Sequence, residues 1–148
     1  MPNVAFATQV TSTLPIVAER AMYFGPSNAR GGDNSEAAAQ PAQTWNLAEG
    51  STKSGFSTFI LALNPGDATA HLSFRFLQEA AAATVQTYTV APHSRFTLQV
   101  NQVLPGVAFS TIVASDQPVV VERVMYFNNS SGGTAALGVP SAQLNQLK

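Results

Sequence analysis

The chain has 148 residues, of which 45% are hydrophobic and only 10% charged, with a formal net charge of −1 and no cysteine. These values argue against a basic nucleic-acid-binding surface and exclude disulfides and cysteine metal sites, and no segment reaches the ~18–20 apolar residues that span a bilayer. A neutral surface rich in Ser, Thr, Asn and Gln predicts an extracellular or cell-surface protein. The first residues lack a signal-peptide pattern, so we expect an export signal to have been removed or to lie upstream.

Short apolar segments follow one another along the chain, separated by turn signals about every ten residues, which is the spacing of a sandwich or barrel. The first two predicted strands are 4–10 and 16–24, and the polar segment 25–43 is predicted to be a surface loop. The later predicted strands are 45–48, 56–63, 70–78, 84–90, 95–100, 107–114 and 119–127. Residues 128–148 are expected to be loop and tail. The prediction is one all-β domain over 1–148, an antiparallel immunoglobulin-like or jelly-roll-like β-sandwich.

A repeat joins the two ends of this pattern. Residues 6–25 read FATQVTSTLPIVAERAMYFG and residues 109–128 read FSTIVASDQPVVVERVMYFN, so that 11 of 20 positions are identical at an offset of 103. Such self-similarity indicates a modular protein. The sequence therefore predicts a duplicated strand pair at the two chain ends, with residues 4–24 as an orphan copy of closing strands.

Six further motifs mark one complete unit between residues 45 and 127. They read WNLAEGSTKSGFST (45–58), NP (64–65), PHSR (92–95), VN (100–101), FST (109–111) and PVVVERVMY (118–126). As a group they resemble the tandem β-sandwich repeat of large surface proteins in Chloroflexota and actinobacteria. The resemblance implies an extracellular, non-catalytic building block, and it carries no active site with it.

The chain departs from the repeat near its end. Residues 140–145 read PSAQLN where residues 41–46 read PAQTWN, so that Leu144 stands in the place of Trp45 and no AEG follows. The next unit is therefore not expected to begin here. This departure favours self-assembly over a role as one link in a long stalk.

Four of the chain's fifteen charges lie in two Glu-Arg pairs inside apolar strands, Glu19-Arg20 and Glu122-Arg123. Charge in such places is costly unless it is paired, and neighbours on a strand point to opposite faces. We therefore expect ion pairs between strands, such as Glu19 with Arg123 or Glu49 with an arginine. The alternative is a ligand-binding or catalytic carboxylate. A pair that occurs twice favours the scaffold interpretation.

Aromatic residues offer a second candidate site. The side chains of Trp45, Tyr23, Tyr88 and Tyr126 are expected to pack in the core or along sheet edges, and the alternative is a sugar-stacking platform. His93 is expected in an exposed turn, and no aspartate shows the spacing of a calcium loop. We predict no catalytic residues, no metal and no cofactor.

Two functions remain open from the sequence. The first is a structural subunit of a surface layer, filament or appendage, which assembles with copies of itself by strand addition. In this hypothesis residues 4–24 and 107–127 form a quasi-symmetric pair in one sandwich, or 4–24 complete a neighbouring subunit. The second is an adhesion module that binds carbohydrate or a host surface through the segments 25–43 and 128–138.

Overall fold

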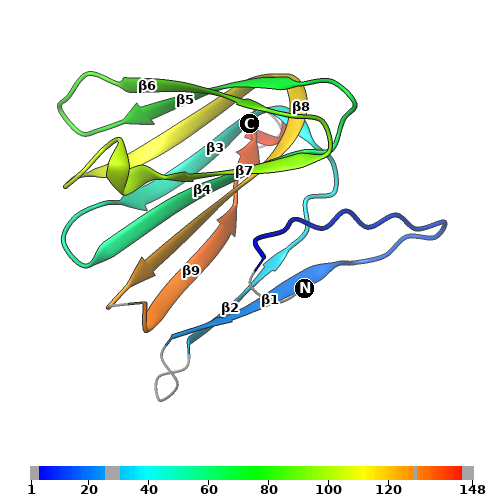
Figure 1. Cartoon of the computed structure of the whole chain (residues 1–148), viewed down its shortest axis with the longest axis horizontal. Coiled ribbons are helices and arrows are strands. Elements are labelled where there is room, and N and C mark those ends of the chain that lie inside the picture. Colours follow the sequence, from blue (N-terminus) through cyan, green and yellow to red (C-terminus); the bar gives the residue numbers. More distant parts are fainter. Residues whose placement is uncertain (1–3, 26–30, 129, 145–148) are drawn as a thin grey trace.

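The computed structural model describes residues 4–25, 31–128 and 130–144. Almost all of its regular structure is antiparallel β-strand (Figure 1). The strands are β1 (Glu19–Phe24), β2 (Gly31–Glu36), β3 (Ala42–Ser51), β4 (Phe56–Asn64), β5 (Ala70–Leu77), β6 (Thr84–Val90), β7 (Ser94–Gln99), β8 (Ala108–Phe127), β9 (Gly132–Leu137) and β10 (Val139–Pro140). A 3-10 turn, η1 (Val100–Gln102), and a short helix, α1 (Ser141–Leu144), complete the described elements.

The alternation of apolar and polar residues along a strand determines which of its faces is buried. In β5, Leu72, Phe74 and Phe76 are almost completely buried, while His71 and Arg75 on the other face are exposed. The period of two follows from strand geometry and places all three apolar side chains on one face of the sheet. This face forms part of the core.

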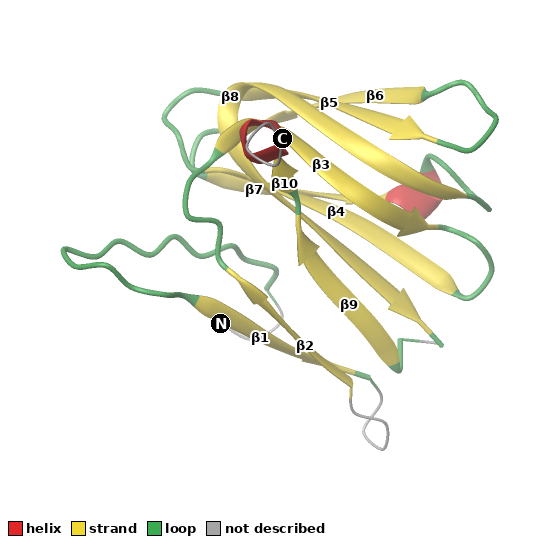
Figure 2. Cartoon of the chain, turned by 180° about the vertical axis from the view of Figure 1, so that it is seen from behind, coloured by secondary structure: helices red, strands yellow, loops and turns green. Residues whose placement is uncertain are grey.

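Strand β8 belongs to both layers of the sandwich. Its first half lies between β3 and β5, and its second half lies between β4 and β9. The layer orders are therefore β10-β3-β8-β5-β6 and β7-β4-β8-β9, joined through one continuous strand (Figure 2). The two layers enclose one cluster of buried side chains. The predicted all-β antiparallel sandwich is thus confirmed.

The predicted break between 107–114 and 119–127 is wrong, because β8 runs through it as 20 consecutive residues. Between these two predicted strands lie Asp116 and Pro118, and both residue types favour turns. Instead, the pairing on β3 jumps from Ala114 opposite Thr44 to Val119 opposite Ala42. The extra residues on β8 form a bulge that bends the strand from one layer to the other without ending it.

Three other predictions at the chain ends need correction. Residues 4–10 form no strand, and β1 begins only at Glu19. The predicted loop 25–43 contains β2 and the start of β3, and the predicted tail contains β9, β10 and α1. The sequence GGDNSE of β2 has low strand propensity, but pairing with β1 supplies the structure that propensity does not. Within the described residues, no helix is long and apolar enough to cross a membrane.

Candidate assembly site

The hairpin β1–β2 is a second copy of the hairpin β8–β9. In the first, Phe24 lies opposite Gly31, and in the second, Phe127 lies opposite Gly132. Both ladders end with one further main-chain bond of 2.9 Å, from Ala37 to Ala18 and from Gly138 to Val121. The repeat therefore extends beyond the windows of high identity and includes the second strand of each hairpin.

The two copies have different neighbours. In β8, residues 122–127 pair with β9 on one edge and with β4 on the other. Among the described residues, β1 pairs with β2 alone, in a separate two-stranded sheet. The hairpin β1–β2 lies beside the sandwich and against its β8–β9 edge (Figures 1 and 2).

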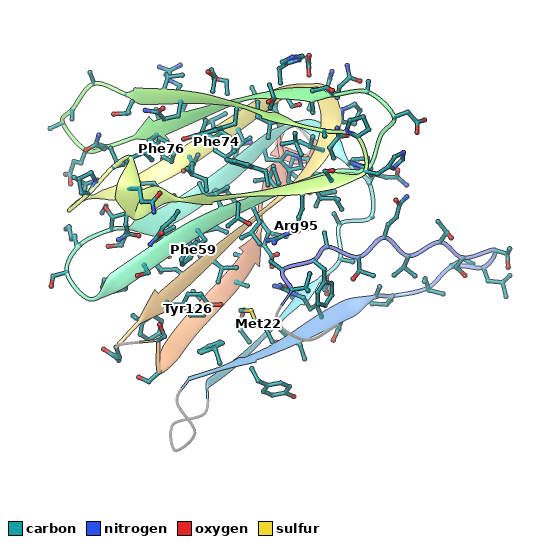
Figure 3. All side chains as sticks on the ribbon, viewed as in Figure 1. Met22, Phe59, Phe74, Phe76, Arg95 and Tyr126 are labelled. Carbon is teal, nitrogen blue, oxygen red and sulfur yellow. The ribbon has the colours of Figure 1, made fainter. Side chains whose placement is uncertain are left out.

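The contact between the hairpins brings two non-equivalent faces together. Strand alternation puts Arg20, Met22 and Phe24 on one face of β1, and these correspond to residues of β8 that face the core. Here this face lies on the outer side of β8. The Phe24 ring meets Tyr126 edge-on with centroids 5.4 Å apart, and the Tyr126 hydroxyl lies 3.6 Å from the Met22 sulfur (Figure 3).

Polar contacts fix the position of the hairpin. The Arg20 guanidinium bonds the Glu122 carboxylate, and the Ser35 hydroxyl also donates to Glu122, at 3.3 Å. On the second strand, the Asp33 carboxylate accepts the backbone N–H of Ala135. The Arg20–Glu122 pair is partly exposed, so it contributes at most ~1 kcal/mol and serves mainly to set the register.

The second Glu-Arg pair has a different environment. Arg123 is 7% exposed, and its Nη1 donates to the Glu49 carbonyl at 2.8 Å and lies 3.8 Å from the Glu49 carboxylate. Among the described residues, its Nε has no hydrogen-bond partner. Of the two predicted pairings, Glu49 with an arginine is present, whereas Glu19 does not meet Arg123 and is exposed. The two arginines of these identical dipeptides therefore join different elements. Arg20 joins the hairpin β1–β2 to β8, and Arg123 joins β8 to β3.

The segment before β1, residues 4–18, is here called the arm. It has no regular secondary structure, and Figure 1 shows it running out from the body of the molecule and back to β1. Its large apolar side chains are more than half exposed. They are Val4, Phe6, Val10, Leu14, Ile16 and Val17. The predicted quasi-symmetric pairing of 4–24 with 107–127 inside one sandwich is therefore absent.

Three exposed apolar residues of the arm, Phe6, Val10 and Ile16, have counterparts in β8 that are among the most buried residues of the molecule. Phe6 is 58% exposed and its counterpart Phe109 is 6% exposed, whereas Val10 is 55% exposed and its counterpart Val113 is fully buried. The same residue types thus lie in solvent in one copy and in the core in the other. Large apolar side chains exposed together in this way make the arm a candidate interaction surface.

The bend of β8 is also present in the arm. In β8, the Gln117 N–H donates to the Ser115 hydroxyl at 3.2 Å, and in the arm, the Leu14 N–H donates to the Ser12 hydroxyl at 3.2 Å. Such local serine bonds stabilise a turn without help from neighbouring strands. The arm therefore keeps the local bend of the strand that it duplicates.

The four aromatic residues of the second candidate site do not form one platform. Trp45 is 1% exposed, and its indole N–H lies within bonding distance of the carbonyls of Val119, at 2.8 Å, and Ala42, at 3.0 Å. Tyr88 packs on Phe96 and Tyr126 lies under the hairpin, so that only Tyr23 is largely exposed.

Two histidine–aspartate pairs lie on the surface. The His71 ring bonds Asp116 at 2.7 Å, and the His93 ring bonds Asp67 at 2.8 Å. The backbone N–H of His71, followed by its side chain, holds the pKa of the Asp116 carboxyl below the usual 3.8. In the described part of the chain, no three metal-ligating side chains come together. Both pairs are largely exposed, and they lie at the start of β5 and just before β7.

Sequence reasoning missed the contribution of the glycines. A Cβ at Gly133 would lie 2.9 Å from both the Phe24 and the Tyr126 ring, so only glycine leaves room for the docked hairpin. The signal was present as two Gly-Gly dipeptides, 31–32 and 132–133, at nearly the offset of the repeat.

No family model and no curated protein matches the chain. Solved structures that share its fold include one from Thermotoga maritima and one from Anabaena. A protein of Thermotoga maritima, designated 1070, is 20% identical, with a TM-score of 0.63 over 68% of this chain and 96% of that one. The Anabaena sensory rhodopsin transducer is 19% identical, with a TM-score of 0.52 over 56% of this chain and 86% of that one. At such identities the likeness concerns the fold alone.

Proposed function

We propose that the protein is a non-catalytic structural module that works outside the cell and assembles with modules of its own kind through the arm. The observation that carries this proposal is the difference in burial between the arm and β8. The arm presents in solvent the side chains that β8 places in the core. A segment with that pattern is suited to strand addition, in which main-chain bonds supply affinity and alternate side chains supply specificity.

Burial supplies the driving force. Fully burying one large aliphatic or aromatic side chain is worth ~1.5–3 kcal/mol, and six such side chains lie exposed on the arm. Ordering a strand and losing translational freedom offset part of this gain. These side chains are already partly covered, so only part of that figure is gained, and main-chain bonds to a partner strand would add to it.

The test is the oligomeric state of the full chain, measured by light scattering and negative-stain microscopy. Replacing Phe6, Val10 and Ile16 together by serine should abolish assembly, because all three lie on the face that matches the core face of β8. The matched control replaces Gln9, Thr11 and Thr13 by serine on the opposite face and should assemble as the wild type does. Assembly by the first variant at wild-type concentrations would disprove the role of the arm.

Adhesion remains a second candidate, with a smaller site than the sequence suggested. Tyr23 is 83% exposed beside a hollow of about 210 Å3 that Gly32, Asp33 and Asn34 help to line. An exposed tyrosine ring next to polar groups is suited to stacking on a sugar. A glycan screen of the monomer tests this candidate, and Tyr23→Ala should remove any saturable binding that depends on this hollow.

A further inference from the structure

Strand β8 shows what covers the sequence of the arm when that sequence is folded. Residues 110–115 pair with β5 on one edge, and β3 pairs with the other edge. Val113 lies between Trp45 and Phe74, and the Phe109 ring meets Phe76 edge-on with centroids 5.5 Å apart. We call the place between β3 and β5 the central position.

A glycine shapes the central position for a phenylalanine. A Cβ at Gly50 would lie 2.4 Å from the Phe109 ring, so the ring occupies the space that any side chain at residue 50 would fill. Phe6 is the counterpart of Phe109 in the arm. The arm therefore carries the side chain for which this hollow is built.

From residue 6 to residue 13, before the bend, the identities between the arm and β8 lie on one face, whereas beyond the bend Pro15 and Val17 match Pro118 and Val120 on the other face. In the arm, Phe6, Thr8, Val10 and Ser12 equal Phe109, Thr111, Val113 and Ser115, which alternate along the side of β8 that includes its most buried residues. The residues between them, Ala7, Gln9, Thr11 and Thr13, all differ from their counterparts Ser110, Ile112, Ala114 and Asp116. Before the bend, the repeat has thus retained the face that fits the central position, and not the outer face.

The described residues include two copies of the sequence that fits the central position, the arm and the first half of β8, but only one central position. In a second wild-type copy this position is already filled by β8, so insertion of an arm would release an equivalent strand and gain almost nothing. A sandwich with an empty central position would gain the whole contact. We infer that the partner of the arm is a sandwich of the same repeat type, on another polypeptide, whose central position is vacant. This inference rests on the proposed function and names the acceptor.

The test uses the full chain as both donor and acceptor. In the acceptor, Val10→Asp and Val113→Asp together disable both strands, because a carboxylate at either residue is costly to bury in the central position. The donor is the affinity-tagged wild type, co-expressed with the acceptor. We expect a 1:1 complex and the return of a cooperative melting transition for the acceptor, which should lack one when it is alone.

Two donor variants distinguish insertion into the central position from nonspecific association. Val10→Asp places its charge on the face that enters the central position and should recover at least ~10-fold less acceptor. Gln9→Asp places the same charge on the outer face and should recover as much acceptor as the wild type. Equal recovery by the two donors, or no recovery by the wild type, would overturn the inference.

A second, less destabilised acceptor controls for the case in which the double aspartate variant fails to fold at all. Phe6→Ala with Phe109→Ala leaves the strands intact and removes only the rings, so that this variant should remain folded but melt early. Adding the wild type should raise its melting temperature, and adding Phe6→Ala donor should not. Absence of a shift with the wild type counts against the inference.

The inference and the proposed function fail differently. Self-assembly that depends on the arm, without rescue of either acceptor, would place the arm on a sheet edge and refute the inference alone. Rescue by a wild type that stays monomeric would support the inference and would show that the arm does not join wild-type copies at a sheet edge.

Discussion

Strand β8 and the segment formed by the arm and β1 contain related sequences, identical at 11 of 20 positions, in two different environments. Both bend at an equivalent serine, and both lead into a hairpin whose glycines lie beneath a phenylalanine ring. Only β8 has strands on both edges, and only its side chains are buried. The comparison teaches that the bend and the hairpin are encoded locally, whereas burial depends on the neighbours that the rest of the chain supplies.

Removing the equivalent phenylalanine ring from each copy should give the largest difference in stability between them. Phe109→Ala should lower the free energy of unfolding by ~3–5 kcal/mol, since it empties a site in the core. Phe6→Ala should change it by less than ~0.5 kcal/mol in a dilute monomer, because the ring is exposed. Urea titration at low concentration measures both. Equal losses would mean that the arm is buried within its own molecule.

The two arginines give the next largest contrast. Arg123→Ala should cost ~2–3 kcal/mol, because it opens a cavity between the layers and leaves the Glu49 carbonyl without its donor. Arg20→Ala should cost at most ~1 kcal/mol, since its ion pair is partly exposed. Chemical denaturation checks both values.

Glu49→Gln is the control for the Arg123 contact. It removes the distant carboxylate contact but keeps the carbonyl that accepts the short bond, so it should be nearly neutral. A large loss would show that the carboxylate, rather than the carbonyl, holds Arg123.

Two glycines test how the hairpins dock. Gly133→Ala should weaken docking by ~1–2 kcal/mol, because the new methyl group would meet both aromatic rings. Gly32 is its counterpart, and a Cβ there would lie 3.3 Å from the exposed Tyr23 ring and 3.6 Å from the Met22 carbonyl, so Gly32→Ala should be tolerated. Hydrogen exchange of β1 and β2 measures the effect, with faster exchange expected for Gly133→Ala alone.

The smallest effect concerns Asp116, whose counterpart in the arm is Thr13. Its carboxyl has a pKa below 3.8 in the folded state, so the unfolded chain binds the proton first as the pH falls. The stabilisation is present above the unfolded pKa and is lost as the pH falls through the folded value. Urea midpoints measured from ~pH 5 to ~pH 2 should therefore fall less steeply for Asp116→Asn than for the wild type.

Much of the sandwich was visible in the sequence. The alternation of Leu72, Phe74 and Phe76 predicted a strand with one buried face, and the structure has it. The sequence predicts two strands on either side of the bend near Ser115, because the residues that follow it include Asp and Pro, which favour turns. Only the pairing with β3 shows that β8 continues through the bend. Strand β2 was missed for a similar reason, since its polar residues become a strand only beside β1.

The candidate site was less visible. The repeat identified Arg20 and Glu122 as residues that need partners, but not as partners of each other, because their contact joins a core-type face to an outer face. Ser35 and Asp33 carried no signal in the sequence, since their roles depend on how the hairpin lies. The residues in these contacts are far apart in the sequence and meet only when the hairpin packs on the sandwich. Sequence patterns along one strand therefore do not predict which residues become partners.

The short strand β10 determines where a mechanical load would pass. The chain enters the sandwich at the start of β3 and leaves it through β10, which pairs with β3 at Trp45 and Asn46. A pull on both ends of the sandwich is therefore carried first by two adjacent residue pairs at one corner, and the layers that share β8 lie off this path. Tension applied at these two points would therefore be expected to detach β10 from β3 before it disturbs the strands around β8.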